Sequence, residues 1–521
     1  MANYSFELMA IEPEKWDPKW FNNVIEIFRT EGFKTFHHKN SVHVWRDVKQ
    51  KGVLKYSDAL TIKSIEIAQG RRGLGISNKR LYFKNSSEKI DTRRELEITK
   101  NPPHRDIETS KNQQIIVRNT LKEKFGRNTS LIELEPVDLN LSTRRIVQIG
   151  NNKKIPPYSL NSLYKSLGFD RFPQNFTVRI CPLEGVSDSV VSIYKNSLID
   201  VANARKTEIN IKKIEKKEII NRLNEMEKNN AKPIAGVCIL FILPHHAEKP
   251  TNETLSLLNS MDNKRVPFRR CFSNDDFNFS IPDQFPSILF AAGGIPHRSG
   301  ILGEKPIWTV GIDLGHNPSK NVSTLAVTLV DPSGILTVAW LTDHPRDETI
   351  DQQKMSIILE KCKQELIGRG LSDANILVIR DGKKLKNEND NIYHEKLTSK
   401  LTFLELKKRG NPQIVQHNNG AKLQTSPCAV IIPGSLTMYL ITKAPTKFDN
   451  FPSILKVNWK EKLNKLNLSP KDIAGILTTS SAAPGLGSKE HYLPSAIYWA
   501  DGIAKTNERD LRFRGLPVFN F

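Results

Sequence analysis

The sequence predicts a multidomain protein of the α/β class. Its 521 residues exceed what a single hydrophobic core ordinarily organises, so two to four domains are expected. From about residue 166 onward, apolar segments of strand length alternate with amphipathic helical segments, an order typical of α/β domains. In the last third, acidic residues follow apolar strands, which places candidate chemistry at strand ends.

The charge of the chain indicates a polyanionic partner. The sequence has 77 Lys+Arg against 56 Asp+Glu, a formal net charge of +21. Nucleic acid is the commonest partner of such a protein, because neutralising phosphates releases counterions and supplies affinity. A generally solvated basic surface is the alternative, since the basic runs are short and dispersed, as at Lys212–Lys217 and Lys407–Arg409.

Composition excludes several other classes. Mean hydropathy is −0.42, and no stretch approaches the roughly 18 apolar residues of a membrane span, so no membrane partner is expected. The first residues lack the basic start and apolar run of a secretory signal, which favours the cytoplasm. The five cysteines form no CxxC pair, so we expect buried thiols rather than a zinc site or disulfides.

Residues 1–165 predict a strand-rich α+β region. Short alternating segments such as Ser41–Trp45 mix with polar stretches such as Lys89–Gln114, without a strong helical period. The Pro-containing stretch Lys153–Tyr158 is typical of a linker, so a domain boundary is expected near residue 165.

Residues 166–305 predict an α/β domain, and residues 306–521 a second one. The expected elements of the first are a strand at Asn175–Ile180, helices at Ser187–Ala202 and Lys213–Lys228, and a strand at Ile234–Leu243. Those of the second are strands at Trp308–Gly315, Ser323–Val330, Ile335–Leu341 and Ile376–Arg380, and helices at Asp347–Ile367 and Ser495–Lys505. The order β-β-β-α-β with acids at strand ends indicates an RNase H-like layout.

Three aspartates are candidate metal ligands. Asp313 follows the first of these strands, Asp381 follows the fourth, and Asp501 lies in the late helix. In-line phosphodiester hydrolysis is well served by two metal ions about 3.5 to 4 Å apart, and Mg²⁺ or Mn²⁺ prefers carboxylate oxygens. A single aspartate after a strand commonly only begins a turn. The conjunction of three indicates a metal site.

Five segments in order resemble the PIWI domain of Argonaute proteins, over roughly residues 305 to 505. They read VGIDLGHNPS, ILVIRDGK, LTFLELKKRGNPQIV, TSPCAVIIPGSLTMYLITKA and LPSAIYWAD. The resemblance, to a compact prokaryotic Argonaute, implies an RNase H-like PIWI domain at 306–521 and a Rossmann-like MID domain at 166–305. It implies a guide-directed endonuclease that binds a short guide DNA or RNA and a complementary target, in defence against invading DNA.

The resemblance also implies a fourth acid that joins Asp313, Asp381 and Asp501 in catalysis. Active Argonautes carry a glutamate in a loop before the helix that precedes the RDG strand, and Arg346–Ile350 fits the pattern R-x-E-x-I. Glu348 is therefore the candidate, with Asp343 and Asp347 as fallbacks. The alternative is that Asp347 and Glu348 only place negative charge in the first turn of a helix.

The guide 5′ end is expected in the MID domain, near the strand that ends ILPHH. Many Argonautes hold a 5′ phosphate with a Tyr, a Lys, a Gln and a second Lys, in that order. At the positions that resemble these, the chain has Thr254, Leu258, Arg270 and Ala291. A pocket without fixed cations favours a 5′-hydroxyl guide, because burying a phosphate dianion then loses solvation that nothing restores. Alternatively, His245, His246, Lys249, Arg269 or Arg270 supplies the charge. Lys408 and Arg409, the pair in the KKRG segment, are further candidate guide contacts.

The N-terminal region leaves two alternatives open. Residues 1–165 are too few for an N domain and a full PAZ domain, so PAZ is expected to be absent or vestigial. That resembles short Argonautes, which usually have damaged acidic sites and act with a separate effector protein. A non-cutting, guide-loaded target sensor with such a protein partner is therefore one alternative. The other is an actin-like or Hsp70-like ATPase, suggested by GIDLG, for which Ala483–Gly487 is the only later Gly-rich candidate.

Overall fold

The computed structural model describes most of the chain, and structural statements below concern the described residues. These are residues 5–51, 54–67, 71–83, 107–125, 130–144, 146–149, 153–155, 160–244, 251–264, 266–273, 277–299, 306–317, 322–345, 350–382, 391–398, 400–418, 420–445, 451–482, 491–505 and 518–520. Contacts divide the chain into unit 1, Met1–Ser142 with Leu406–Lys460, and unit 2, Thr143–Glu405 with Glu461–Phe521. The predicted boundaries near 165 and 305 both fall inside unit 2 and stay predictions.

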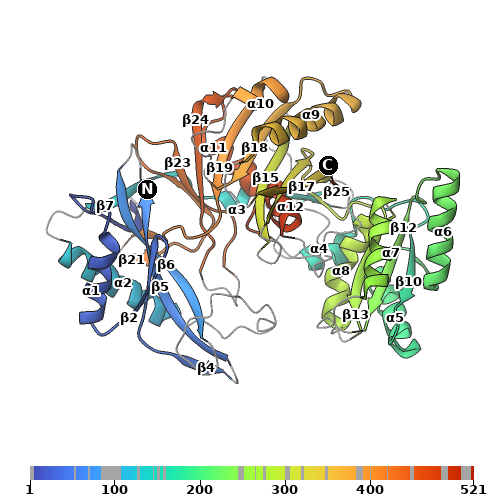
Figure 1. The fold of residues 1–521 in the computed structure, drawn as a ribbon, viewed down its shortest axis with the longest axis horizontal. Coiled ribbons are helices and arrows are strands. Elements are labelled where there is room, and N and C mark those ends of the chain that lie inside the picture. Colours follow the sequence, from blue (N-terminus) through green and yellow to red (C-terminus); the bar gives the residue numbers. More distant parts are fainter. Residues whose placement is uncertain are drawn as a thin grey trace. The chain divides into compact units, whose positions relative to one another are not determined.

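Unit 1 is built on antiparallel strands with two helices against one face (Figure 1). Its N-terminal strands are β1 (Ser5–Glu12), β2 (Lys34–His38), β3 (Ser41–Trp45), β4 (Lys49–Lys51), β5 (Leu54–Glu66), β6 (Arg72–Phe83) and β7 (Ser130–Asp138). The later ones are β20 (Ile414–His417), β21 (Ala421–Leu423), β22 (Cys428–Ile431), β23 (Thr437–Ile441) and most of β24 (Leu455–Asn464). The expected strand-rich α+β organisation is confirmed.

Two helices form the core of unit 1 with β3 and β5. In α1 (Trp20–Thr30), Trp20, Val24 and Phe28 recur every four residues and are buried, so one face of the helix is apolar. The second helix is α2 (Ile107–Lys124), whose Val117 and Leu121 join the same cluster as Leu60 and Ile62 of β5. Because side chains alternate along a strand, Thr61 and Lys63 of β5 lie on the opposite face of the sheet.

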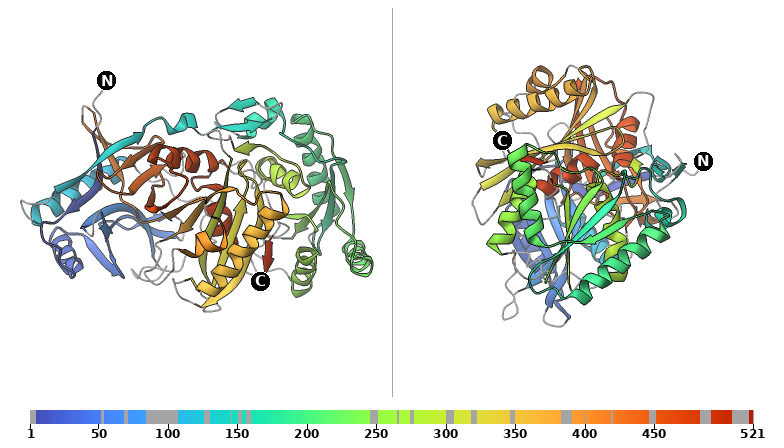
Figure 2. Two further views of the ribbon diagram at one scale, coloured as in Figure 1. Left: turned by 90° about the horizontal axis from the view of Figure 1, so that it is seen from above. Right: turned by 90° about the vertical axis from the view of Figure 1, so that its right-hand side faces the viewer.

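Unit 2 contains a parallel sheet with helices on both faces (Figures 1 and 2). The strand order is β11 (Asn210–Lys213), β10 (Thr177–Pro182), β12 (Val237–Leu243) and β13 (Phe268–Phe272). One face packs against α5 (Asp188–Ala204) and α8 (Phe277–Ala291), and the other against α6 (Lys216–Asn229) and α7 (Asn252–Asn263). β12 reads VCILFIL because a strand covered on both faces needs apolar residues at every position. This is the expected Rossmann-like layer.

The second sheet of unit 2 has the predicted RNase H-like order. Its strands run β18 (Asn375–Asp381), β15 (Ile307–Asn317), β16 (Val322–Val330) and β17 (Leu336–Pro345), with β25 (Val518–Asn520) beside β17. β15, β16 and β17 are antiparallel neighbours, and β18 runs parallel to β15. The helix α9 (Gln352–Gly368) packs on one face and α12 (Ser495–Ala504) on the other (Figure 1).

The remaining elements are α3 (Leu141–Arg144), β8 (Val147–Ile149), β9 (Lys153–Ile155), α4 (Leu160–Leu167), β14 (Arg298–Ser299), α10 (Asn391–Lys396), β19 (Leu401–Lys407) and α11 (Pro470–Ser480). Of these, β14, β8 and β9 form a three-stranded sheet. The predicted linker at Lys153–Tyr158 is wrong at its start, because Lys153–Ile155 pairs with β8 as a strand. The five cysteines are free and buried, as expected. Within the described chain, no helix has the length and apolarity required to span a membrane.

The start of α9 differs from the prediction. The sequence suggested a helix from Asp347, but α9 begins at Gln352, where the Asp351 carboxylate accepts a hydrogen bond from the Lys354 backbone N–H at 2.8 Å. Aspartate is a preferred residue for capping the first turn in this way. Asp347 and Glu348 come before this helix in the sequence and lie outside the described residues, so the alternative for them stays a prediction.

Candidate metal centre and nucleic-acid interface

The alternation of side chains along β15 sets up the candidate metal centre. Val310 and Ile312 are fully buried in the core that includes α9. Gly311, Asp313 and Gly315 project to the other face, toward α12. A Cβ on Gly311 would lie 2.3 Å from the Ala496 carbonyl oxygen, so this strand accepts α12 closely only because glycine stands there.

Asp381 reaches the same place from the neighbouring strand. β18 runs parallel to β15 with Ile312 opposite Arg380, so Asp313 and Asp381 come next in register at the same edge of the sheet. Asp313 is 4% exposed, and its Oδ1 accepts a hydrogen bond from the Leu314 backbone N–H at 2.8 Å. Asp381 is half-buried.

Asp501 is supplied by α12. Trp499, Ile503 and Ala504 pack this helix against the sheet, which leaves Asp501 directed to the edge where the strands end. Lys505, one turn later, forms an ion pair with the Asp501 carboxylate. This pair was not predicted from the sequence, although the i,i+4 spacing of its two residues is the signal by which helical ion pairs are recognised.

Asp313, Asp381 and Asp501 offer carboxylate oxygens that all lie within 4.8 Å of one another. Three carboxylates from three separate elements repel one another unless cations lie between them. Hard oxygen donors at this spacing fit Mg²⁺ or Mn²⁺, and they suit the pair of ions about 3.5 to 4 Å apart that phosphodiester hydrolysis uses. The structure thus brings together the three predicted ligands, while their binding of metal stays a prediction.

The fourth predicted acid, Glu348, lies outside the described residues, as do Arg346, Asp347 and Thr349. Asp343 precedes this segment on β17 and is exposed. Its backbone carbonyl accepts a hydrogen bond from the Lys354 ammonium at 2.6 Å. Asp343 is not part of the aspartate cluster, so Glu348 remains the candidate from the sequence. The Gly-rich segment Ala483–Gly487 also lies outside the described residues.

The carboxyl ends of β10, β12 and β13 form a second candidate site. In open parallel sheets, ligands bind where successive connections leave to opposite sides, which here is between β10 and β12. The segment after β12, with the predicted guide ligands His245 and His246 and the alternative Lys249, lies outside the described residues.

On α7, the predicted guide ligand Thr254 is 7% exposed. Its backbone N–H donates to the Thr251 hydroxyl oxygen at 3.2 Å, and that hydroxyl in turn donates to the Thr254 hydroxyl oxygen at 3.0 Å. Leu258 is 1% exposed and packs in the core under the sheet. Ala291 ends α8 and is half-buried. These side chains supply no positive charge.

Arg269 and Arg270 of β13 differ in burial and in the contacts of their guanidinium groups. Arg269 is 8% exposed, its guanidinium donates to the Phe268 carbonyl oxygen at 2.8 Å, and burial lowers its pKa. Arg270 is half-buried, and its guanidinium lies 5.4 Å from the centroid of the Phe272 ring. Alternation along the strand separates the two side chains onto opposite faces. Arg270 is thus the better placed cation.

In unit 1, the predicted guide contacts Lys408 and Arg409 follow β19. Lys408 is half-buried and Arg409 is exposed. Gly410 has φ +67°, a conformation that favours glycine, and the Asn411 side chain donates to the Lys407 carbonyl oxygen at 2.7 Å. The loop that carries the basic pair is therefore held by its own backbone contacts.

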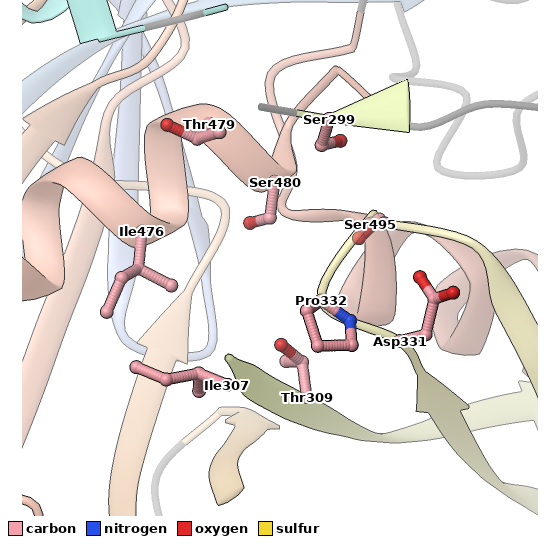
Figure 3. A pocket seen from close by; sticks show the side chains of 10 residues that line it. Ser299, Ile307, Thr309, Asp331, Pro332, Ile476, Thr479, Ser480 and Ser495 are labelled. Carbon is pink, nitrogen blue, oxygen red and sulfur yellow. The ribbon is translucent and has the colours of Figure 1, made fainter. Parts of the chain in front are cut away.

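A small pocket lies at the start of α12 (Figure 3). Hydroxyl side chains surround it, and Asp331 contributes a carboxyl whose pKa is raised by burial. Its volume is about 40 Å³, enough for one or two waters. None of the three clustered aspartates lines it, so it is separate from the candidate metal centre.

The sequence matches no known family profile and no curated protein. Its fold, however, is similar to that of solved structures. Clostridium butyricum Argonaute bound to a guide DNA and a 19-mer target DNA superposes with TM-score 0.63 and 12% identity over 96% of this chain and 87% of that one. This chain has the Argonaute fold.

Further structures show the same Argonaute fold. Marinitoga piezophila Argonaute in complex with 5′ OH guide RNA and target DNA gives TM-score 0.63 at 12% identity, over 96% of this chain and 86% of that one. Aquifex aeolicus Argonaute gives 0.56 at 12% identity, over 96% and 95%. The order of strands β15 to β18 is RNase H-like, and the parallel sheet of β10 to β13 is Rossmann-like.

Proposed function

We propose that this protein is a guide-directed endonuclease that cuts nucleic acid complementary to a bound short strand. The observation that carries the proposal is the convergence of Asp313, Asp381 and Asp501 within 4.8 Å in an RNase H-like layer. A nuclease needs negative side chains there to hold cations against the negatively charged backbone of its substrate. In defence, such an activity would act on invading DNA.

The three aspartates differ in burial and in hydrogen bonding. Asp313 is the most buried, and the hydrogen bond that its carboxylate accepts from the Leu314 backbone N–H fixes its orientation at the centre of the site. Asp381 and Asp501 flank it from a strand end and a helix, and the ion pair with Lys505 orients Asp501. Divalent cations bound here would supply an activated water and stabilise charge on the leaving oxygen. Glu348 would complete the set and order that water.

The nucleic-acid partner is supported by charge and by fold. The net charge of +21 suits two phosphate backbones. The carboxyl edge of β10 and β12 is where an open α/β sheet binds ligands, and we assign the guide 5′ end to it. The Marinitoga piezophila structure with the same fold contains a 5′ OH guide RNA, which supports a 5′-hydroxyl guide for this chain as well.

One observation favours the non-cutting alternative. The ion pair with Lys505 already neutralises part of the Asp501 charge, so the cluster is less negative than three free carboxylates. If Lys505 replaces a metal ion permanently, the chain would be a guide-loaded target sensor that acts through a partner protein. This reading predicts guide and target binding without cleavage.

Cleavage by the purified full chain separates the two functions. We would load DNA and RNA guides, add complementary labelled targets, and compare Mg²⁺, Mn²⁺ and EDTA. The endonuclease predicts guide-dependent cutting that EDTA abolishes and that falls by several orders of magnitude in Asp381→Asn. Asp373→Asn is the control, because Asp373 is exposed and pairs with Lys400 elsewhere. Target binding without cutting under every metal condition would establish the sensor instead.

A further inference from the structure

Lys505 places a positive charge against the candidate metal centre. Its ammonium forms an ion pair with the Asp501 carboxylate, and the two residues stand one turn apart at the end of α12. Asp501 is in turn one of three carboxylates whose oxygens all lie within 4.8 Å of one another. A cation of the protein itself thus contacts a carboxylate that the centre needs for metal.

The backbone that carries Lys505 is held by the packing of α12 on β15. The preceding residue, Ala504, is 4% exposed and lies against Gly315, where a Cβ would come within 2.0 Å of the Ala504 carbonyl oxygen. The Lys505 backbone N–H donates to the Asp501 carbonyl oxygen at 3.3 Å. Because the base of the side chain is fixed in this way, the i,i+4 spacing brings the ammonium to the Asp501 carboxylate.

The ion pair is open to solvent at its lysine end. The side chain of Lys505 is 41% exposed and that of Asp501 is 19% exposed. Exposed pairs are weak, because water screens the charges and a long side chain loses conformational freedom. The ammonium supplies one positive charge, whereas Mg²⁺ or Mn²⁺ supplies two and binds carboxylate oxygens directly. A divalent ion can therefore displace Lys505 from Asp501.

Lys505 acts on one side of the centre. In the part of the chain that the structure describes, its ammonium pairs with Asp501 and with neither Asp313 nor Asp381. Asp313 and Asp381 come from the adjacent parallel strands β15 and β18, whereas Asp501 comes from the helix. Competition between Lys505 and a metal ion is therefore expected at the helix side of the centre.

We propose that Lys505 is a stand-in cation, which neutralises Asp501 in the metal-free protein and leaves it when a divalent ion binds on that side of the centre. The inference rests on the proposed function, because it takes the three aspartates to be metal ligands. An ion held by Asp313 and Asp381 meets no competition from Lys505, whereas an ion that needs Asp501 binds more weakly. Lys505 thereby sets the concentration of divalent ion at which the centre is complete.

Calorimetric titration of the full-length protein with Mn²⁺ measures this competition without any cleavage. Wild type should show a tighter and a weaker binding event. In Lys505→Met the weaker event should become about tenfold tighter, the order of effect of one unit charge on a nearby divalent ion in a water-like dielectric. Lys505→Arg should bind as weakly as wild type or more weakly, because a guanidinium keeps the charge and binds a carboxylate with two hydrogen bonds. Lys400→Met is the matched control, because Lys400 is also exposed and pairs with Asp373.

Thermal melts separate a stand-in cation from an ordinary surface ion pair. Lys505→Met should melt below wild type in EDTA, because the three carboxylates then repel one another without the compensating ammonium. With saturating Mn²⁺ the difference should vanish or reverse, because the bound ions replace that charge and stabilise the native state. An ordinary ion pair would lower the melting temperature equally in both conditions and leave the Mn²⁺ affinity unchanged. That result would overturn the proposal.

Chemical labelling follows the departure of Lys505 itself. Acetic anhydride acylates free amines, and mass spectrometry would compare Lys505 with Lys400 in EDTA and in saturating Mn²⁺. Lys505 should be acylated several-fold faster with Mn²⁺, because its amine no longer pairs with Asp501, while the rate at Lys400 should not change. If labelling of Lys505 stays low with Mn²⁺ and Lys505→Met binds an additional ion, Lys505 holds its place permanently. The proposal would then be wrong, and the non-cutting sensor would be supported.

Failure of the inference is distinguishable from failure of the proposed function. If wild type and Lys505→Met bind Mn²⁺ with equal affinities, only the role of Lys505 is wrong, and the three aspartates remain the proposed metal ligands. If neither protein binds Mn²⁺ at any concentration tested, the metal centre fails, and the endonuclease proposal fails with it.

Discussion

Gly315 on β15 lies against Ala504 on α12 so closely that a Cβ on the glycine would sit 2.0 Å from the Ala504 carbonyl oxygen. Gly311, four residues earlier on the same strand face, meets Ala496 in the same way. Between the two glycines, Asp313 points toward Asp501. The absence of two Cβ atoms thus sets how near the helix brings its aspartate to the strand.

Gly315→Ala should push the last turn of α12 away from the sheet. Because the clash is with backbone, neither residue can relieve it by a rotamer change, and overpacking of this kind costs about 1–3 kcal/mol. We expect lower thermal stability and a loss of Mn²⁺ affinity, measured by calorimetry, as Asp501 moves from the cluster. Gly368→Ala is the control, since a Cβ there meets open space. Equal Mn²⁺ affinities in both variants would contradict the proposed role of the packing.

Asp313→Asn should stabilise the metal-free protein and abolish its response to metal. Three carboxylates whose oxygens lie within 4.8 Å repel one another, so removing one charge lowers this repulsion and raises the free energy of unfolding. Binding of a divalent ion to the native state alone raises the melting temperature, and that rise requires the ligands. Thermal melts with and without Mn²⁺ measure both effects. Asp373→Asn should melt like wild type, and a full Mn²⁺ response in Asp313→Asn would remove it from the ligand set.

Asp313 and Asp381 could be predicted from the sequence because each follows an apolar run, and the end of such a strand is indicated by the local sequence pattern. Asp501 was a weaker candidate, since only its conjunction with the other two acids and the family resemblance distinguish it from other acids on a helix. The start of α9 was misplaced because Asp347 and Glu348 look like first-turn acids, whereas the actual cap is Asp351. Short polar segments of this kind carry too weak a pattern to fix a helix end.

Side-chain partners could be predicted only in part from the sequence. The i,i+4 spacing of Asp501 and Lys505 indicates a helical ion pair, but whether the pair forms depends on which rotamers the packed helix allows. Arg269 was predicted to be a guide contact on the basis of its charge, yet it lies in the interior beside Phe268.

Glu348→Gln should abolish cutting while the three aspartates still bind Mn²⁺. Its proposed role is to complete the coordination and order a water, which an amide performs poorly. Asp347→Asn should have a mild effect, because the R-x-E-x-I pattern assigns the role to the glutamate. Single-turnover cleavage with saturating guide measures both. The opposite ranking would move the role to Asp347.

His43 should make unit 1 sensitive to acid. Burial, helped by the charge of Lys79 and by His38, lowers the pKa of His43 to about 3. The unfolded chain takes up the proton near pH 6.5, whereas the folded chain does not, so folding stability falls as the pH drops from 6.5 toward 3. In His43→Gln, urea denaturation should show a smaller loss between pH 6.5 and 4 than in wild type. Parallel curves for the two proteins would exclude His43 as the cause.

The last prediction concerns the chemistry of the guide 5′ end. Leu258 is buried in the core and Ala291 has no charge. The two positions at which Argonautes usually carry lysines therefore supply no positive charge to a phosphate. A 5′-hydroxyl guide should therefore bind at least as tightly as its 5′-phosphate counterpart, because a dianion loses solvation that a hydroxyl does not need.

Arg270 is the main threat to this prediction. Its side chain is half-buried in the middle of β13, with the guanidinium beside Phe272, and an arginine fork can chelate a phosphate in place of both lysines. Competition between the two guides, measured in wild type and in Arg270→Ala, separates the cases. If the hydroxyl assignment is right, the ratio of the two affinities is near one or favours the hydroxyl and changes little in the variant. A phosphate preference in wild type that disappears in Arg270→Ala would make Arg270 the phosphate ligand.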